Sequence, residues 1–202
     1  MPPRYPSLAA LLRSELVVAE DEATAALVGE LRHVRGAQQF SRAEFIRMCR
    51  WKSPRAQSHY ERNTSAAVRR ASREALRTRS ERRRLEVLTA LQGVSVPTAS
   101  AILTLIDPRR YGVIDIRAWQ LLFRTGAVRR RPGGVGFRFA DWERYLAILR
   151  HHARALGVSA RQVELTLFEY HRKTHRGRLY RGRAARSRYN QAGALVSRKG
   201  QG

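Results

Sequence analysis

The chain has 202 residues, 43% of them hydrophobic, so it can bury one sizeable core or two small lobes. Its 40 lysine and arginine residues outnumber 16 acidic ones, and the formal net charge of +24 at pH 7 predicts a phosphate-rich partner or an acidic membrane surface. The single cysteine, Cys49, excludes an internal disulfide and any metal centre held by several cysteines.

Apolar residues at helical spacing predict helices in the first part of the chain. Ser7 is the expected N-cap of a stretch that ends at Gly36 and that the acidic run at 20–22 divides into two helices. Ser41 begins the next helix, and Glu44 three positions later completes a capping box.

Further helices are expected at about 54–62, 64–76 and 80–91. Beyond them, the spacing predicts a helix at 116–123 and two long helices that meet near residue 157. Because no segment has the character of a convincing strand, the expected fold class is all-α. We expect one helical domain over 1–180 and a basic, disordered tail at 181–202, where Arg, Gly, Ala and Ser predominate.

The basic residues are almost all arginine, since Lys52, Lys173 and Lys199 are the only lysines. A GC-rich genome would raise the arginine content, but arginine also grips phosphate with two donors, which favours a nucleic acid as the partner. No apolar run approaches the roughly 20 residues of a membrane span, and residues 1–6 lack the form of a signal peptide. We therefore expect a monomeric protein of the bacterial cytoplasm that associates with the nucleoid and with no membrane.

The segment 91–103 combines a tight turn with the start of a helix. Gly93 gives the backbone the freedom that the turn needs, and Val94 is expected to point back into the core. The next helix starts near 96–98, where Pro97 in the first turn costs no hydrogen bond. Free backbone N–H groups at such a start bind anions, so a DNA phosphate is the expected ligand.

This segment resembles the helix-hairpin-helix of the DNA glycosylase superfamily that includes endonuclease III, MutY adenine glycosylase and 8-oxoguanine glycosylase. The residues that match its pattern are Leu91, Gly93, Val94, Thr98, Ala99, Ile102 and Leu103. Gln92 and Ser95 depart from the pattern, since the family has proline and glycine there. The hairpin by itself indicates DNA binding, because many proteins without enzymatic activity carry one.

Asp115 supplies a second match to the same superfamily. It follows two apolar residues, opens the helix expected at 116–123 and lies 18 residues after Pro97, which is the interval at which the family carries its catalytic aspartate. The resemblance implies a two-lobed glycosylase fold, with a hairpin lobe at about 64–135 and a second lobe formed by 1–63 and 136–180.

The resemblance also implies a reaction. Breaking an N-glycosidic bond builds positive charge on the deoxyribose, and a fixed carboxylate stabilises that charge or orients a water molecule. A carboxylate at a helix N-terminus is favoured in its ionised form. Pro97 stands where bifunctional family members carry a Schiff-base lysine, which implies a monofunctional enzyme. The predicted activity is hydrolytic excision of a damaged or modified base from duplex DNA by Asp115, in repair or against modified foreign DNA.

The predicted contacts to the DNA and to the flipped base follow from the same resemblance and from residue chemistry. The DNA contacts are assigned to Gly93, Val94, Ser95, Thr98 and Arg117, and the base pocket to Trp51, Lys52, Trp119, Trp142, Phe168 and Tyr170. Lys52 could also replace the missing hairpin lysine from a different helix.

No cofactor is expected, although the family's hairpin can hold a monovalent cation through backbone carbonyls. His171 and His175 have the i, i+4 spacing of a zinc pair, but no pattern of acidic or cysteine partners accompanies them, so no metal site is predicted.

Two other interpretations stay open. Asp115 can be an ordinary N-cap, in which case the protein is a helix-hairpin-helix module that binds DNA without excising a base. A weaker alternative is a basic RNA-binding protein, since an arginine-rich tail suits RNA equally well.

Overall fold

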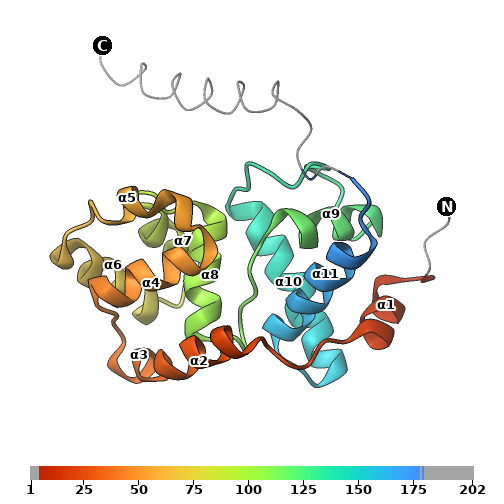
Figure 1. Ribbon diagram of the computed structural model, residues 1–202, viewed down its shortest axis with the longest axis horizontal. Helices are drawn as coiled ribbons and strands as arrows, with labels where there is room; N and C mark the ends of the chain where they lie inside the picture. The colour runs from red at the N-terminus through yellow and green to blue at the C-terminus, as the bar shows by residue number, and fades with distance from the viewer. Residues whose placement is uncertain (1–4, 178, 180–202) are drawn as a thin grey trace, which may run out of the picture.

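The computed structural model describes residues 5–177 and 179, and every regular element in this part of the chain is helical. The elements in chain order are α1 (Leu8–Glu15), α2 (Glu22–Glu30), α3 (Arg32–Ala37), α4 (Arg42–Lys52), a 3-10 turn η1 (Pro54–Ala56), α5 (Gln57–Tyr60), α6 (Ser65–Arg77), α7 (Glu81–Thr89), α8 (Val96–Ile106), α9 (Ile116–Arg124), α10 (Phe139–Leu156) and α11 (Ala160–Thr174) (Figure 1). The all-α fold class is confirmed for these residues. The expected basic tail at 181–202 lies outside them.

Serine side chains begin several of these helices, as the sequence predicts. The hydroxyl oxygens of Ser7, Ser41, Ser80 and Ser159 each accept a hydrogen bond from the backbone N–H three residues later. Ser41 and Ser159 also form capping boxes with the residue at that position. Each bond satisfies one of the N–H groups that a helix start leaves unpaired, and such a cap is worth about 1 kcal/mol.

The acidic run at 20–22 separates two helices, as expected. Helix α1 ends at Glu15, and α2 begins after Asp21, whose carboxylate accepts a hydrogen bond from the backbone N–H of Thr24. No helix within residues 5–177 and 179 combines the length and the apolar character needed to cross a membrane.

The helices pack in two groups (Figure 1). In one group, which runs from α2 to α8, the central helix α8 contacts α2, α3, α4 and α7. In the other group, α11 contacts α1, α9 and α10. The segment 107–115 leads from α8 in the first group to α9 in the second.

This grouping differs from the division predicted from the sequence. That division placed α9 with α8 in a lobe at 64–135 and placed α4 with the terminal helices. In the structure α9 lies against α11, and α4 lies against α8. Helix α9 buries Trp119, whose ring centroid is 6.4 Å from that of Tyr145 on α10. The apolar face of each helix could be predicted from its spacing, but the partner of that face depends on contacts between distant parts of the chain.

The end of the 107–115 segment is held by both helix groups. The backbone N–H of Ile114 donates to the hydroxyl oxygen of Ser100 on α8, at 3.1 Å. The phenol of Tyr145 on α10 donates to the carbonyl oxygen of Val113, at 3.0 Å. The residue that follows, Asp115, is therefore fixed at the boundary between the two groups.

Gly112 brings the same segment close to α10 and α11. A Cβ atom at this position would lie 2.5 Å from a methyl carbon of Leu149 and 2.8 Å from Cβ of Glu164. Because real Cβ atoms do not approach other atoms so closely, the segment can pass here only with glycine at residue 112.

Candidate active site

The predicted hairpin forms a turn between α7 and α8. Gly93 has a φ of +81°, the left-handed conformation that favours glycine, and Ser95 is the N-cap of α8. The side chain of Val94 is buried, as expected, and so is that of Thr98, whose hydroxyl lies 3.1 Å from that of Ser95. Among the predicted phosphate contacts in the turn, Gly93 and Ser95 are exposed, whereas Val94 and Thr98 anchor the turn to the protein.

Asn63 clamps this turn from the other side, a role that no pattern in the sequence predicts. Its side-chain amide donates to the carbonyl oxygen of Gln92 at 3.0 Å, and its Oδ1 accepts from the backbone N–H of Gln92 at 2.8 Å. The same amide nitrogen lies 2.9 Å from the carbonyl oxygen of Tyr60. Asn63 is buried, so the clamp is protected from competing water.

Tyr60 connects the hairpin to the end of α4. A Cβ atom at Gly93 would lie 2.9 Å from carbons of the Tyr60 ring and 2.8 Å from Cβ of His59, so the turn packs directly on this segment. The hydroxyl of Tyr60 donates to the carbonyl oxygen of Ser53 at 3.3 Å. Ser53 is the C-cap of α4 and immediately follows Lys52.

Asp115 is the N-cap of α9, and its two carboxylate oxygens have different partners. Oδ1 accepts hydrogen bonds from the backbone N–H groups of Arg117, at 2.8 Å, and Ala118, at 3.1 Å. Oδ2 lies 3.4 Å from Nζ of Lys52. The side chain of Asp115 is 11% exposed and that of Lys52 is 22% exposed. The carboxylate is therefore fixed in orientation by α9, and one of its oxygens faces an ammonium group from the other helix group.

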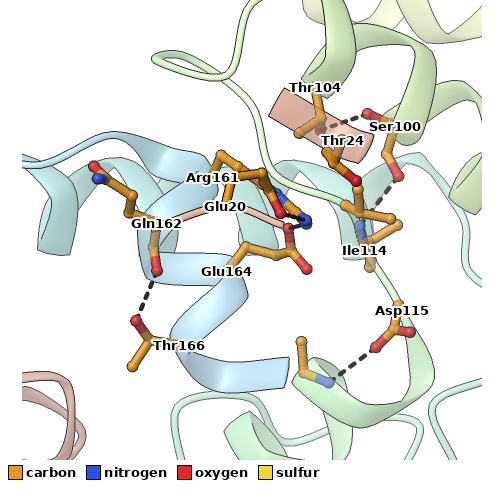
Figure 2. Close-up of polar contacts among 12 residues, drawn as sticks. Glu20, Thr24, Ser100, Thr104, Ile114, Asp115, Arg161, Gln162, Glu164 and Thr166 are labelled. Atoms are coloured by element: carbon orange, nitrogen blue, oxygen red, sulfur yellow. Dashed lines mark hydrogen bonds and ion pairs between the residues drawn. The ribbon is translucent and has the colours of Figure 1, made fainter. Parts of the chain in front are cut away.

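A buried network of charges lies beside this pair (Figure 2). Arg161 on α11 donates to both carboxylate oxygens of Glu20, at 2.6 and 2.9 Å, and to Glu164 on its own helix. Burial raises the pKa of Glu164, and the charge of Asp115 adds to the rise, while Arg161 and Lys52 oppose it. The charges of Lys52, Asp115 and Glu164 therefore influence one another across three helices.

Trp51, Phe168 and Tyr170, three of the predicted pocket aromatics, are half-buried on α4 and α11. The indole N–H of Trp51 donates to the hydroxyl oxygen of Thr24 at 2.9 Å, and the guanidinium of Arg161 lies 5.5 Å from its ring centroid. Trp51 directly precedes Lys52, so it is the pocket aromatic that the chain places next to the Asp115 pair.

The other two half-buried aromatics have partners of their own. The predicted DNA contact Arg117 has its guanidinium 5.7 Å from the ring centroid of Phe168. Tyr170 lies in an edge-on contact with Tyr5, at 5.8 Å between ring centroids.

Trp119 and Trp142 are core residues and do not line an accessible pocket. Trp119 is fully buried, and its indole N–H donates to the carbonyl oxygen of Arg131 at 3.0 Å. Trp142 is also fully buried and stacks on Tyr111 with 6.2 Å between ring centroids. Both lie on the apolar faces of their helices, where an aromatic residue most often serves packing.

His171 is a further buried polar residue near the site. Neither nitrogen of its fully buried ring has a hydrogen-bond partner among the residues that the structure describes, and the ring stacks on that of His175 at 4.5 Å. Burial lowers the pKa of His171 to about 4, with the positive charge of Arg124 adding to the effect. The described part of the chain has no group of three or more His, Cys, Asp or Glu side chains that could hold a metal ion.

Three polar residues of the site were not predicted from the sequence. The spacing of the residues could have indicated Glu164 and His171, but not Asn63. Glu164 and His171 lie on the same stripe of α11 as the buried residues Ala160 and Leu167, and a titratable residue on an apolar stripe is detectable from spacing. Asn63 stands in a polar stretch and contacts a residue far along the chain, so its spacing carries no such signal.

Comparisons of this chain with protein-family models, with curated proteins and with solved structures find no match. A function therefore has to be inferred from the site itself. A carboxylate anchored through one oxygen can stabilise a neighbouring positive charge or orient a water molecule through the other. The adjacent lysine can neutralise the carboxylate, donate a hydrogen bond or, once it has lost its proton, attack an electrophile.

Proposed function

We propose that this protein is a DNA glycosylase that hydrolyses the bond between a damaged or modified base and its deoxyribose, with Asp115 as the catalytic carboxylate. The observation that carries the proposal is the arrangement of Asp115, which has one oxygen fixed by two backbone N–H groups and the other facing Lys52 at 3.4 Å. The resemblance of the hairpin and of the position of Asp115 to the helix-hairpin-helix glycosylases supports it.

The hairpin and the site would act on the same duplex. Gly93 and Ser95 are exposed on the turn and would contact a phosphate, and the Tyr60–Ser53 hydrogen bond joins that turn to the residue beside Lys52. Arg117, two residues after Asp115, would contact the strand that carries the flipped nucleotide. The formal charge of +24 would supply the general attraction to DNA.

In the proposed reaction, the bond between C1′ of the sugar and the base nitrogen breaks. The base leaves with the electron pair and takes up a proton, and the sugar becomes positively charged. The free oxygen of Asp115 stabilises this charge, and a water molecule adds its oxygen to C1′ and loses a proton. A fixed carboxylate suits this chemistry because it needs no reorganisation when the charge develops.

Lys52 offers a second course for the same reaction, which the 3.4 Å contact with Asp115 favours. After losing a proton, its amine could attack C1′ in place of water as the bond to the base breaks. Opening of the sugar ring at the C1′–O4′ bond, with a proton taken up by O4′, would then give a Schiff base, which would add strand cleavage to base release. Treatment with borohydride during turnover reduces a Schiff base to a stable protein–DNA adduct. An adduct that forms with the wild type and not with Lys52→Arg supports the lysine course, and its absence during active base release supports hydrolysis.

The proposed activity is tested with a panel of duplexes that carry oxidised, alkylated, deaminated or hypermodified bases. The wild type and Asp115→Asn are incubated with each duplex, and freed bases are identified by mass spectrometry. Release of one base by the wild type and not by Asp115→Asn supports the proposal. Lack of release from every duplex, or equal release by both proteins, contradicts it.

A second candidate function is DNA binding without catalysis. It is favoured by one observation, the two hydrogen bonds through which Asp115 caps α9, because an N-cap alone would account for an aspartate at this position. This candidate predicts tight binding to unmodified duplex DNA with no base release, and binding that Asp115→Asn retains.

A further inference from the structure

Four arginines line an open groove at the end of the molecule formed by the start of α11 and the end of α10. Arg109 and Arg110 come from the segment after α8, and Arg150 and Arg154 come from α10. The groove has a volume of about 900 Å³, and Gly157 also lines it. Among the described residues, no acidic side chain lines it.

Two of the four guanidiniums are held in place. Those of Arg110 and Arg150 lie 5.3 and 5.1 Å from the centroid of the Tyr111 ring. Both also pair with Glu81, at 3.4 and 2.8 Å, and Glu81 pairs with Arg84 as well. The single negative charge of Glu81 is thus shared among three positively charged guanidiniums. A net positive charge therefore remains at the edge of the groove.

The other two arginines are exposed and have no acidic partner in the described part of the chain. Within residues 5–177 and 179, no carboxylate lies within ion-pair distance of Arg109 or Arg154. The groove therefore combines arginines that have no carboxylate partner with arginines that are held at fixed positions. Such an arrangement can bind phosphate oxygens through the paired donors of each guanidinium.

The positive charge of the groove comes from these side chains and not from the N-terminus of α11. The first N–H groups of that helix are already used, since Ala160 donates to the carbonyl oxygen of Arg109 at 3.2 Å and Arg161 donates to that of Pro108 at 3.0 Å. These two bonds also fix the backbone of residues 108 and 109 against α11, so the Arg109 side chain starts from a rigid position.

The groove and the hairpin lie at opposite ends of α8. This helix begins after the hairpin at Val96 and ends at Ile106, just before the arginine-bearing segment, and its 11 residues span about 16 Å. In Figure 1 the hairpin end of α8 and the start of α9 are at the top of the molecule, and the 107–110 segment is at the bottom. A straight duplex seated on the hairpin would leave the groove free.

We propose that this groove is a second phosphate-binding site that takes the backbone of a second nucleic-acid segment, so that one molecule can hold two duplexes together. The proposal goes beyond base excision, and it rests on the part of the proposed function in which the hairpin binds a first duplex. The fixed pair Arg110 and Arg150 would set the position of the backbone, and Arg109 and Arg154 would neutralise its phosphates.

The test uses the full-length protein and two unmodified duplexes, one labelled with a donor fluorophore and one with an acceptor. Energy transfer between the duplexes on addition of protein reports bridging. The variant is the double substitution Arg109→Gln and Arg154→Gln. The matched control is Arg32→Gln with Arg69→Gln, which removes the same charge from two exposed arginines outside the groove.

We expect the wild type and the control to bridge the duplexes and the groove variant to lose most of the energy transfer while keeping its melting temperature. The slope of log affinity for the second duplex against log salt should fall by about 2 in the variant, because each phosphate contact contributes about 0.9. Equal bridging by the variant and the wild type, or an equal loss in the control, overturns the proposal.

Titration with inorganic pyrophosphate separates a nucleic-acid backbone from a free phosphate compound as the ligand. A general phosphate site used by nucleic acid is supported by three results together: pyrophosphate binds the wild type, it fails to bind the groove variant, and the wild type bridges duplexes. Suppose that pyrophosphate binding depends on Arg109 and Arg154, and that the protein binds one duplex but never bridges two. This result overturns the assignment of the groove to nucleic acid.

Discussion

Nζ of Lys52 lies 3.4 Å from Oδ2 of Asp115, although the two residues are 63 positions apart in the sequence. Lys52 ends α4 in one helix group, and Asp115 begins α9 in the other. The two residues therefore form an ion pair at the boundary between the groups, where each side chain is only partly exposed. Because of this contact, a substitution of Lys52 should act directly on the position and charge environment of the proposed catalytic carboxylate.

Replacing Lys52 with methionine should slow base release by about 10- to 100-fold, which corresponds to about 1.4–2.7 kcal/mol of activation free energy. The reason is that Oδ2 of Asp115 loses the ion-pair partner that holds it in position in a partly buried site. Single-turnover base release at pH 7 measures the effect. Lys52→Arg keeps the charge and should keep most of the activity. If Lys52→Arg is as slow as Lys52→Met, charge is not what Lys52 supplies, and attack by its amine becomes the better explanation.

Replacing Asn63 with alanine should destabilise the protein by about 2 kcal/mol and weaken its binding to duplex DNA. The substitution leaves the N–H and carbonyl groups of Gln92 without their buried partners, so the hairpin loses its clamp. Urea unfolding and fluorescence anisotropy measure the two effects. Gln57→Ala, which removes an exposed contact with Glu61, is the control and should change neither. Wild-type DNA affinity in Asn63→Ala would show that the clamp does not shape the DNA-binding turn.

Replacing Gly112 with alanine should cost about 1–3 kcal/mol of stability and reduce base release as well. The added Cβ atom would overlap Leu149 and Glu164, and the segment that carries Asp115 would have to move. Gly36→Ala is the matched control, because nothing lies within 4 Å of a Cβ atom there and the residue is inside α3. The control should leave stability unchanged or raise it. A melting temperature of Gly112→Ala equal to that of the wild type contradicts the close approach.

His171 should make the folded state less stable as the pH falls. Burial lowers its pKa in the folded protein to about 4, whereas an unfolded histidine has a pKa of about 6.5. Between these values the unfolded chain binds a proton that the folded protein excludes. The stability from neutral His171 is therefore complete above pH 6.5 and is lost on going down to about pH 4, by about 3 kcal/mol.

Urea unfolding at several pH values, on the wild type and on His171→Phe, measures this contribution. The variant should lose less stability between pH 6.5 and pH 4 than the wild type. His151→Gln, at an exposed position on α10, should keep the wild-type dependence. Parallel curves for the wild type and His171→Phe would show that His171 is not excluded from protonation in the folded state.

The parts of the fold that depend on neighbouring residues could be predicted from the sequence. Ser7, Ser41 and Ser159 cap helices through bonds to residues three positions away, so their patterns predict where the helices begin. Gly93 likewise predicts the turn, because a left-handed backbone conformation is a property of the residue itself.

The parts that depend on distant residues could not be predicted in the same way. The spacing of α9 predicts that Trp119 is buried or lines a pocket, but only the packing of α9 on α11 decides between the two. The clamp between Asn63 and Gln92 joins residues from separate helix ends, and neither has a distinctive neighbour. Lys52 could be named as a candidate because lysine is rare in this chain, but its contact with Asp115 required the three-dimensional arrangement.

In the proposed reaction Asp115 performs chemistry in addition to capping α9, and Asp115→Asn is the variant that separates these two roles. Asparagine caps a helix about as well as aspartate, so the variant should keep the wild-type melting temperature and duplex affinity. Single-turnover base release from the duplex on which the wild type is active is the measurement. We predict that Asp115→Asn releases the base at least about 100-fold more slowly, as expected when one preorganised electrostatic contact is lost. Release at the wild-type rate by a folded, DNA-binding Asp115→Asn protein would contradict the claim.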